Sequence, residues 1–75
     1  MANSANQYGK RLAPDVTESI IDALGGTSAV SRVCEITTAA VAQWRKSGMP
    51  RYRFLFLREK YRKNPIMARP EIRAL

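Results

Sequence analysis

The side chains able to do chemistry are few in this chain, and their types exclude most catalysis. The sequence has no histidine, a single cysteine (Cys34) and six carboxylates, and the carboxylates show no paired spacing for acid/base work. Without histidine and with one thiol, a zinc site has no adequate ligand set. We therefore expect no enzyme activity, no cofactor and no metal, and we expect Cys34 to be a small buried apolar residue.

The remaining chemistry is that of cations, which are unevenly placed. Thirteen lysines and arginines stand against six acidic residues, and ten of the thirteen lie in residues 45–75. A one-sided basic surface is typical of a protein that meets a polyanion, and a merely solvated surface is the alternative. The cluster of Arg58, Lys60, Arg62 and Lys63 is equally compatible with either.

Length and hydropathy limit the architecture. Seventy-five residues make one small domain at most, with little room for a large enclosed site. No apolar run approaches the roughly 20 residues that span a bilayer, and the opening "MANSANQYGKRLAP" lacks the apolar region of a signal peptide. We expect a cytoplasmic protein, associated with the nucleoid if its partner is DNA.

The apolar spacing predicts a compact all-α domain of four to five helices. Residues 1–13, polar and without periodicity, are predicted to be a flexible arm, residues 14–64 the domain, and residues 65–75 a tail with room for a short helix after Pro70.

The first two helices are predicted on either side of Gly25-Gly26. One opens at Pro14, with Asp15 as its cap and Glu18 completing a capping box. Its inner face is predicted to hold Val16, Ile20, Ala23 and Leu24, with Ile21 at the edge. The second helix is predicted to begin at its cap Thr27, and its inner face is predicted to hold Ala29, Val30, Val33 and Cys34.

A third helix is predicted over residues 38–46, only three residues after the second one ends. Thr37 suits its N-cap, and Val41 and Trp44 share an inner face, so Trp44 is expected in the core. The opposite face carries small and hydrogen-bonding side chains, namely Ala39, Ala42, Gln43 and Lys46.

A fourth helix, over residues 51–63, is apolar on two sides. Phe54, Leu57 and Tyr61 form a stripe that suits the core. A second stripe, rotated well away from the first, holds Tyr52, Leu55 and Phe56. Because a helix with two apolar faces usually has two neighbours, we expect this second stripe to be a dimer interface.

Two short helices joined by about three residues, the second with a small polar outer face, describe a helix-turn-helix. The stretch "GGTSAVSRVCEITTAAVAQWRKSGMP" resembles the helix-turn-helix of lambdoid phage Cro and repressor proteins, most closely the small all-helical Cro type. The resemblance covers about residues 20–62, and its ending AVAQWRKSGMP is the more specific part. Ser31 departs from the family's alanine at the closest helix contact, and Glu35 departs from its turn glycine, which predicts a costlier turn.

The resemblance implies a lambda-repressor-like fold and a sequence-specific regulator, a Cro-like repressor, that binds double-stranded DNA as a homodimer. Helix 38–46 would enter the major groove, with Gln43 as the best reader because an amide can bind adenine bidentately. The family's base-reading positions fall on Thr38, Ala39, Ala42 and Gln43. Its phosphate positions fall on Thr27, Ser28, Lys46 and Ser47, and Arg45, Arg51 and Arg53 lie close enough in sequence to extend that contact. A merely solvated Gln43 is the alternative.

Two other classes of function are compatible with the chain. An antitoxin-like protein-interaction module that also autoregulates would use Tyr52, Leu55 and Phe56 on a different protein. A membrane-surface binder would need a basic amphipathic helix. The membrane reading is disfavoured because the basic and apolar positions of residues 51–63 are interleaved.

Overall fold

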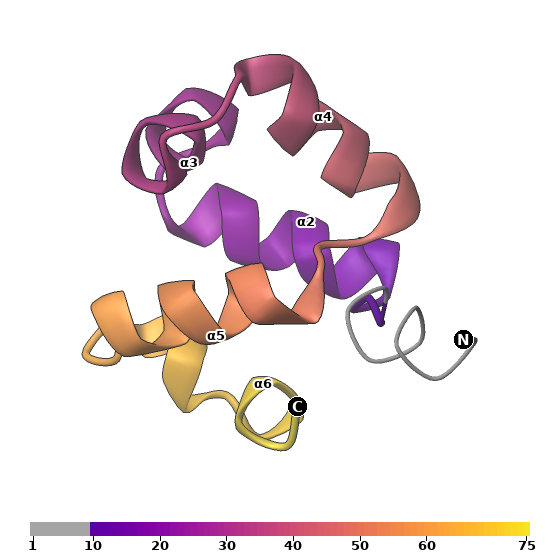
Figure 1. Ribbon diagram of the computed structural model, residues 1–75. Coiled ribbons are helices and arrows are strands. Elements are labelled where there is room, and N and C mark those ends of the chain that lie inside the picture. Colours follow the sequence, from indigo (N-terminus) through magenta and orange to yellow (C-terminus); the bar gives the residue numbers. More distant parts are fainter. Residues whose placement is uncertain (1–9) are drawn as a thin grey trace.

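The computed structural model describes residues 10–75, which form an all-α domain, as predicted. Four helices of eight to ten residues are followed by a 3-10 turn and a last short helix, and an isolated bridge pairs Arg11 with Pro50. The elements are α2 (Pro14–Ala23), α3 (Thr27–Cys34), α4 (Thr38–Ser47), α5 (Arg51–Lys60), η1 (Pro65–Ala68) and α6 (Pro70–Arg73). In Figure 1, α3 and α4 lie on one side of α2 and α5 on the other. No helix in the described part is long and apolar enough to cross a membrane.

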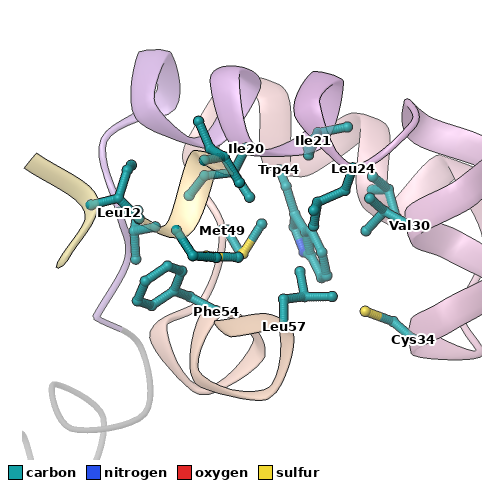
Figure 2. Close-up of a cluster of buried hydrophobic side chains, with 14 residues drawn as sticks. Leu12, Ile20, Ile21, Leu24, Val30, Cys34, Trp44, Met49, Phe54 and Leu57 are labelled. Atoms are coloured by element: carbon teal, nitrogen blue, oxygen red, sulfur yellow. The ribbon is translucent and has the colours of Figure 1, made fainter. Parts of the chain in front are cut away.

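One apolar core joins all of these helices. Phe54, Leu57 and Val41 are fully buried, and Trp44 is 6% exposed, so the predicted inner sides of α4 and α5 are confirmed. Figure 2 shows the Trp44 ring in the middle of the cluster, between Leu24 and Leu57. The orientation of α4 is therefore fixed by two of its own side chains.

α2 begins and packs differently from the prediction. Its N-cap is Ala13, without a side-chain cap hydrogen bond, so the predicted Asp15 capping box is wrong. Pro14 occupies the first helical position, where its fixed φ starts the helix and its missing N–H needs no partner. The buried face holds Thr17, Ile20 and Ile21, whereas Ala23, predicted to be in the core, is exposed.

α2 and α3 end with the same pair of backbone hydrogen bonds. At the end of α2, Gly25 N–H donates to Asp22 and Gly26 N–H to Ile21, and Gly25 has a φ of 109°. At the end of α3, Glu35 N–H donates to Arg32 and Ile36 N–H to Ser31, and Glu35 adopts a φ of 57°. This is the Schellman pattern, and a side chain in its left-handed position costs about 1–2 kcal/mol. The costlier turn predicted at Glu35 is confirmed.

The predicted caps of α3 and α4 had different outcomes. Thr37 caps α4, because its hydroxyl accepts a hydrogen bond from Ala40 N–H at 3.1 Å. Thr27 does not cap α3: the cap is Gly26, whose φ of 99° suits glycine, and Thr27 is already the first helical residue. Ser31, the predicted small change at the helix contact, is buried and donates its hydroxyl to the Ser28 carbonyl oxygen at 2.8 Å.

α5 is shorter than predicted, and the chain beyond it completes the core. The helix ends at Lys60 instead of Lys63. Pro65 disfavours a helical Asn64, and Asn64 instead caps η1 through a hydrogen bond from Ile66 N–H. A helical turn follows Pro70, as expected. Because Ile66, Met67 and Ile72 are buried, the domain does not stop at residue 64.

The segment before α2 is part of the fold from Lys10 onward. Leu12 is 6% exposed, and its N–H donates to the Met49 carbonyl oxygen at 2.9 Å. Met49 N–H in turn donates to the buried Thr17 hydroxyl, and a Cβ at Gly48 would collide with the Leu12 carbonyl oxygen. The predicted flexible arm is therefore wrong for residues 10–13, and the rest of it, residues 1–9, lies outside the described residues.

Candidate nucleic-acid interface

The outer face of α4 is exposed and carries no large apolar group. Val41 and Trp44 hold the opposite side of the helix in the core. The four predicted base-reading residues are all exposed, and they are Thr38, Ala39, Ala42 and Gln43. Small side chains let a helix approach a flat or grooved surface closely, and the Gln43 amide supplies both a donor and an acceptor. The face can therefore form close, directional polar contacts.

The C-terminal end of α4 adds a cation to this face. Lys46 is exposed and shares the side of the helix that holds Ala39, Ala42 and Gln43. Ser47 is exposed too, and its hydroxyl donates to the Gln43 carbonyl oxygen at 3.1 Å. That bond uses the Ser47 proton and leaves the hydroxyl oxygen as an acceptor, so Lys46 is the stronger group for an anion here.

The beginning of α3 holds two further predicted phosphate residues. Ser28 is exposed and Thr27 is half-buried. Both belong to the first turn of α3, where backbone N–H groups have no partner within the helix and the helix dipole favours an anion. The Thr27 hydroxyl accepts a hydrogen bond from Arg45 Nε at 3.1 Å.

Arg45 is turned away from the outer face of α4. It lies four residues after Val41, on the flank of the helix that leans towards α2 and α3. Its Nη2 donates to Asp22 Oδ1 at 2.7 Å, and its Nη1 lies 3.6 Å from Glu18 Oε2. These contacts raise the pKa of Arg45 above its ordinary value, the hydrogen bond to Asp22 contributing most. Arg45 therefore binds partners within the domain, whereas Lys46 is exposed on the outer face of α4.

Arg53 is also apart from the outer face of α4. Its guanidinium lies 5.2 Å from the centre of the Tyr52 ring on the same helix. It is also close to Cys34 at the end of α3: burial raises the pKa of that thiol, and the positive charge of Arg53 partly opposes the rise. Arg51 is half-buried at the start of α5, and its backbone N–H donates to the Lys10 carbonyl oxygen at 2.9 Å.

Lys10 and Arg11 are two basic residues that the sequence reasoning missed. Both are exposed, and Arg11 Nη1 donates to the Gly48 carbonyl oxygen at 2.8 Å. That bond brings Arg11 to the residue that directly follows α4, on the same end of the helix as Lys46. The pair of cations in "GKRL" was the available signal, but nothing in the sequence indicated that the segment is fixed to residues 48–51.

The second exposed surface is the outer side of α5. Tyr52 is 54% exposed, Leu55 36% and Phe56 46%, so the predicted second apolar stripe lies on the surface of the domain. Glu59, exposed and four residues after Leu55, extends this side of the helix. We call these four residues the α5 face. Its aromatic and aliphatic groups have the character of a protein-contact surface.

Comparisons of the chain with protein-family models, curated proteins and solved structures found no match. The resemblance to Cro and repressor proteins therefore depends on the residues that carry it, chiefly those from Gly25 to Pro50.

Proposed function

We propose that this chain is a sequence-specific double-stranded DNA-binding transcriptional regulator, a Cro-like repressor that inserts α4 into the major groove. One observation carries the proposal: the exposed face of α4 holds only small and hydrogen-bonding side chains, while Val41 and Trp44 fix the opposite face in the core. The major groove admits an α-helix, and short side chains let its backbone approach the base edges.

The residues of the outer face of α4 take different roles on DNA. Gln43 reads an adenine through its amide, and Ala39 or Ala42 contacts a thymine methyl group. Thr38, at the start of the helix, is the remaining base-reading position. Lys46 binds a phosphate at the edge of the groove, which positions the helix without reading sequence.

Two groups of phosphate contacts lie near the C-terminal half of α4, one at the start of α3 beside Arg45 and one beside the end of α4. Thr27 and Ser28 offer hydroxyl and backbone N–H donors at the start of α3, where an anion is favoured. Lys10 and Arg11 join Lys46 and Ser47, because the Arg11–Gly48 hydrogen bond holds that segment beside the end of α4. Arg51 lies beside Lys10 and adds one more cation to this group.

The chain acts as a homodimer on DNA, and the α5 face forms the contact between copies. Three large apolar side chains on one side of a ten-residue helix favour burial against a partner. A two-fold contact would place two copies of α4 on successive half-sites, which predicts a palindromic operator.

Selection of bound duplexes from a random DNA pool tests the proposal. A palindromic consensus would support both sequence-specific reading and dimeric binding. The same selection with Gln43→Ala is the matched control, since that variant should enrich a consensus with at least one relaxed position per half-site. No enrichment from the unaltered chain would contradict the proposal.

An antitoxin-like protein-interaction module that also autoregulates is the second candidate. The observation that favours it is the same exposed α5 face, which suits a different protein as well as a second copy. Light scattering of the pure protein, alone and with selected DNA, separates the two. A dimer supports self-association, and a monomer in both conditions favours the foreign partner.

A further inference from the structure

Arg45 connects three helices through a single guanidinium group. From α4 it reaches two carboxylates one turn apart on α2, Asp22 at 2.7 Å and Glu18 at 3.6 Å. Its third nitrogen, Nε, donates to the Thr27 hydroxyl on α3 at 3.1 Å. Each nitrogen therefore faces one partner, and the three partners come from the two helices that flank α4.

This arrangement differs from that of a phosphate-binding arginine. The Arg45 side chain is 24% exposed, less than its partners Glu18 at 55% and Asp22 at 66%. A guanidinium holds its donors in a rigid planar fork. Because the donors of Arg45 face three partners within the domain, those partners fix the orientation of the whole group. A phosphate that approached Arg45 would also meet the two adjacent carboxylates.

The Arg45–Thr27 hydrogen bond also orients the Thr27 hydroxyl. A threonine hydroxyl has one proton and two acceptor lone pairs. Arg45 Nε–H occupies one acceptor lone pair of this hydroxyl, so the hydroxyl proton points away from Arg45. Thr27 is half-exposed at the first turn of α3. Thr27 is thus prepared to donate to an external oxygen.

We propose that Arg45 is a positioning residue: it holds α4 against α2 and the start of α3, and it aims the Thr27 hydroxyl at a DNA phosphate. Arg45 itself makes no phosphate contact. The Thr27 step rests on the proposed DNA-binding function, whereas the holding of the three helices does not.

A first experiment tests the contact without DNA. Arg45→Gln, Asp22→Asn and the double variant are compared with the unaltered chain by thermal unfolding, with Lys46→Ala as the matched control on the same helix. Each single change at the Arg45–Asp22 pair should lower the unfolding midpoint by roughly 3–6 °C. The double variant should lose clearly less than the sum of the two, and Lys46→Ala should leave the midpoint within about 1 °C. Additive losses, or no loss in Arg45→Gln, would overturn the proposal.

A second experiment tests the action through Thr27. Affinity for a fixed duplex is measured across a salt series for Arg45→Gln, Thr27→Val and their double variant. Each single change should weaken binding by about five- to tenfold, and the double variant should bind no more weakly than the worse single variant. Arg45→Gln should keep the salt slope of the unaltered chain, whereas a lost phosphate contact reduces it by about one. A slope reduced like that of Lys46→Ala would make Arg45 a phosphate contact and overturn the proposal.

Arg45→Lys separates geometry from charge. Lysine keeps the positive charge but cannot contact Thr27, Asp22 and Glu18 together, so it should not restore the affinity lost in Arg45→Gln. Full rescue by lysine would mean that charge alone matters, and it would overturn the positioning role. If the unaltered chain binds no duplex DNA, the proposed function fails and the Thr27 step fails with it. The first experiment then still confirms or overturns the contact between helices.

Discussion

The outer face of α4 and the α5 face are both open to solvent, but they differ in side-chain size and polarity. α4 exposes Ala39, Ala42 and Gln43, which are short or amide-bearing. α5 exposes Tyr52, Leu55 and Phe56, which are large and mostly apolar. Both helices are ten residues long and bury two large side chains on their inner sides, so the demands of the core do not explain the difference.

The roles proposed for the two faces account for the difference. A helix that enters a nucleic-acid groove needs short side chains and directional hydrogen bonds, because base edges offer donors and acceptors. A helix that packs against protein gains from large apolar groups, whose burial releases water. One small domain thus presents two chemically distinct surfaces, and variants on the outer face of α4 should leave self-association through the α5 face intact.

The largest expected effect comes from Trp44→Ala, which tests which side of α4 faces the core. Trp44→Ala should lower the free energy of unfolding by roughly 3–5 kcal/mol, most of the stability of a small domain. Circular dichroism during heating should show a lost or strongly lowered transition. If Trp44→Ala keeps its transition but loses DNA binding, Trp44 lies at the DNA contact and the two sides of α4 have been exchanged.

Salt should strongly weaken DNA binding by the outer face of α4, and it should hardly change self-association through the α5 face. If about six phosphates are contacted, affinity for duplex DNA should fall about a thousandfold between 50 and 200 mM salt. Self-association through apolar groups should change little over the same range, and it serves as the internal control. A DNA affinity that barely responds to salt would count against the charge argument.

Phe56→Ala tests the α5 face alone. Removing a large aromatic group from the centre of an apolar contact should weaken self-association by about thirtyfold. Analytical ultracentrifugation measures this effect, and Gln43→Ala should leave self-association unchanged. Equal self-association of Phe56→Ala and the unaltered chain would remove the α5 face from the dimer contact.

Gln43→Ala tests the base-reading role on the outer face of α4. It should cost about 1–3 kcal/mol on the selected site and little on random DNA. The thermal transition should stay in place, because Gln43 is exposed. If binding to random DNA falls as much as binding to the selected site, Gln43 is not reading bases and the recognition helix has been misplaced.

Lys46→Ala should have the smallest effect and the most uniform one. The lost charge faces a phosphate, which every sequence presents equally, so specific and non-specific binding should weaken together. The magnitude of the salt slope should fall by about one. A loss confined to the selected site would instead place Lys46 among the base-reading residues.

The sequence predicts features that depend on neighbours along the chain. Thr37 caps α4 and Val41 and Trp44 face the core, as their spacing indicates. Arg45 differs because its partners Asp22 and Thr27 come from other helices. The sequence around Arg45 does not show whether Arg45 or Lys46 will bind groups within the domain.

Segments without periodicity escaped prediction for a related reason. Leu12 is a single apolar residue among polar ones, and Ile66, Met67 and Ile72 lie in pieces of four residues. A helical pattern needs several turns to be visible. These residues are buried only because the ends of the described segment fold back onto α2 and α5, which the sequence spacing cannot indicate.

The hydrogen bonds between residues 10–12 and 48–51 join two segments that are made at different times during synthesis. Arg11 and Gly48 are 37 residues apart, so at ordinary rates of translation Arg11 is made about 2–7 seconds before its partner. Over that interval α2 exists without α4, α5 or Ile72 to cover Ile20 and Ile21, both fully buried in the finished domain. α2 therefore cannot bury its inner face until the elements that follow it in the chain have been made.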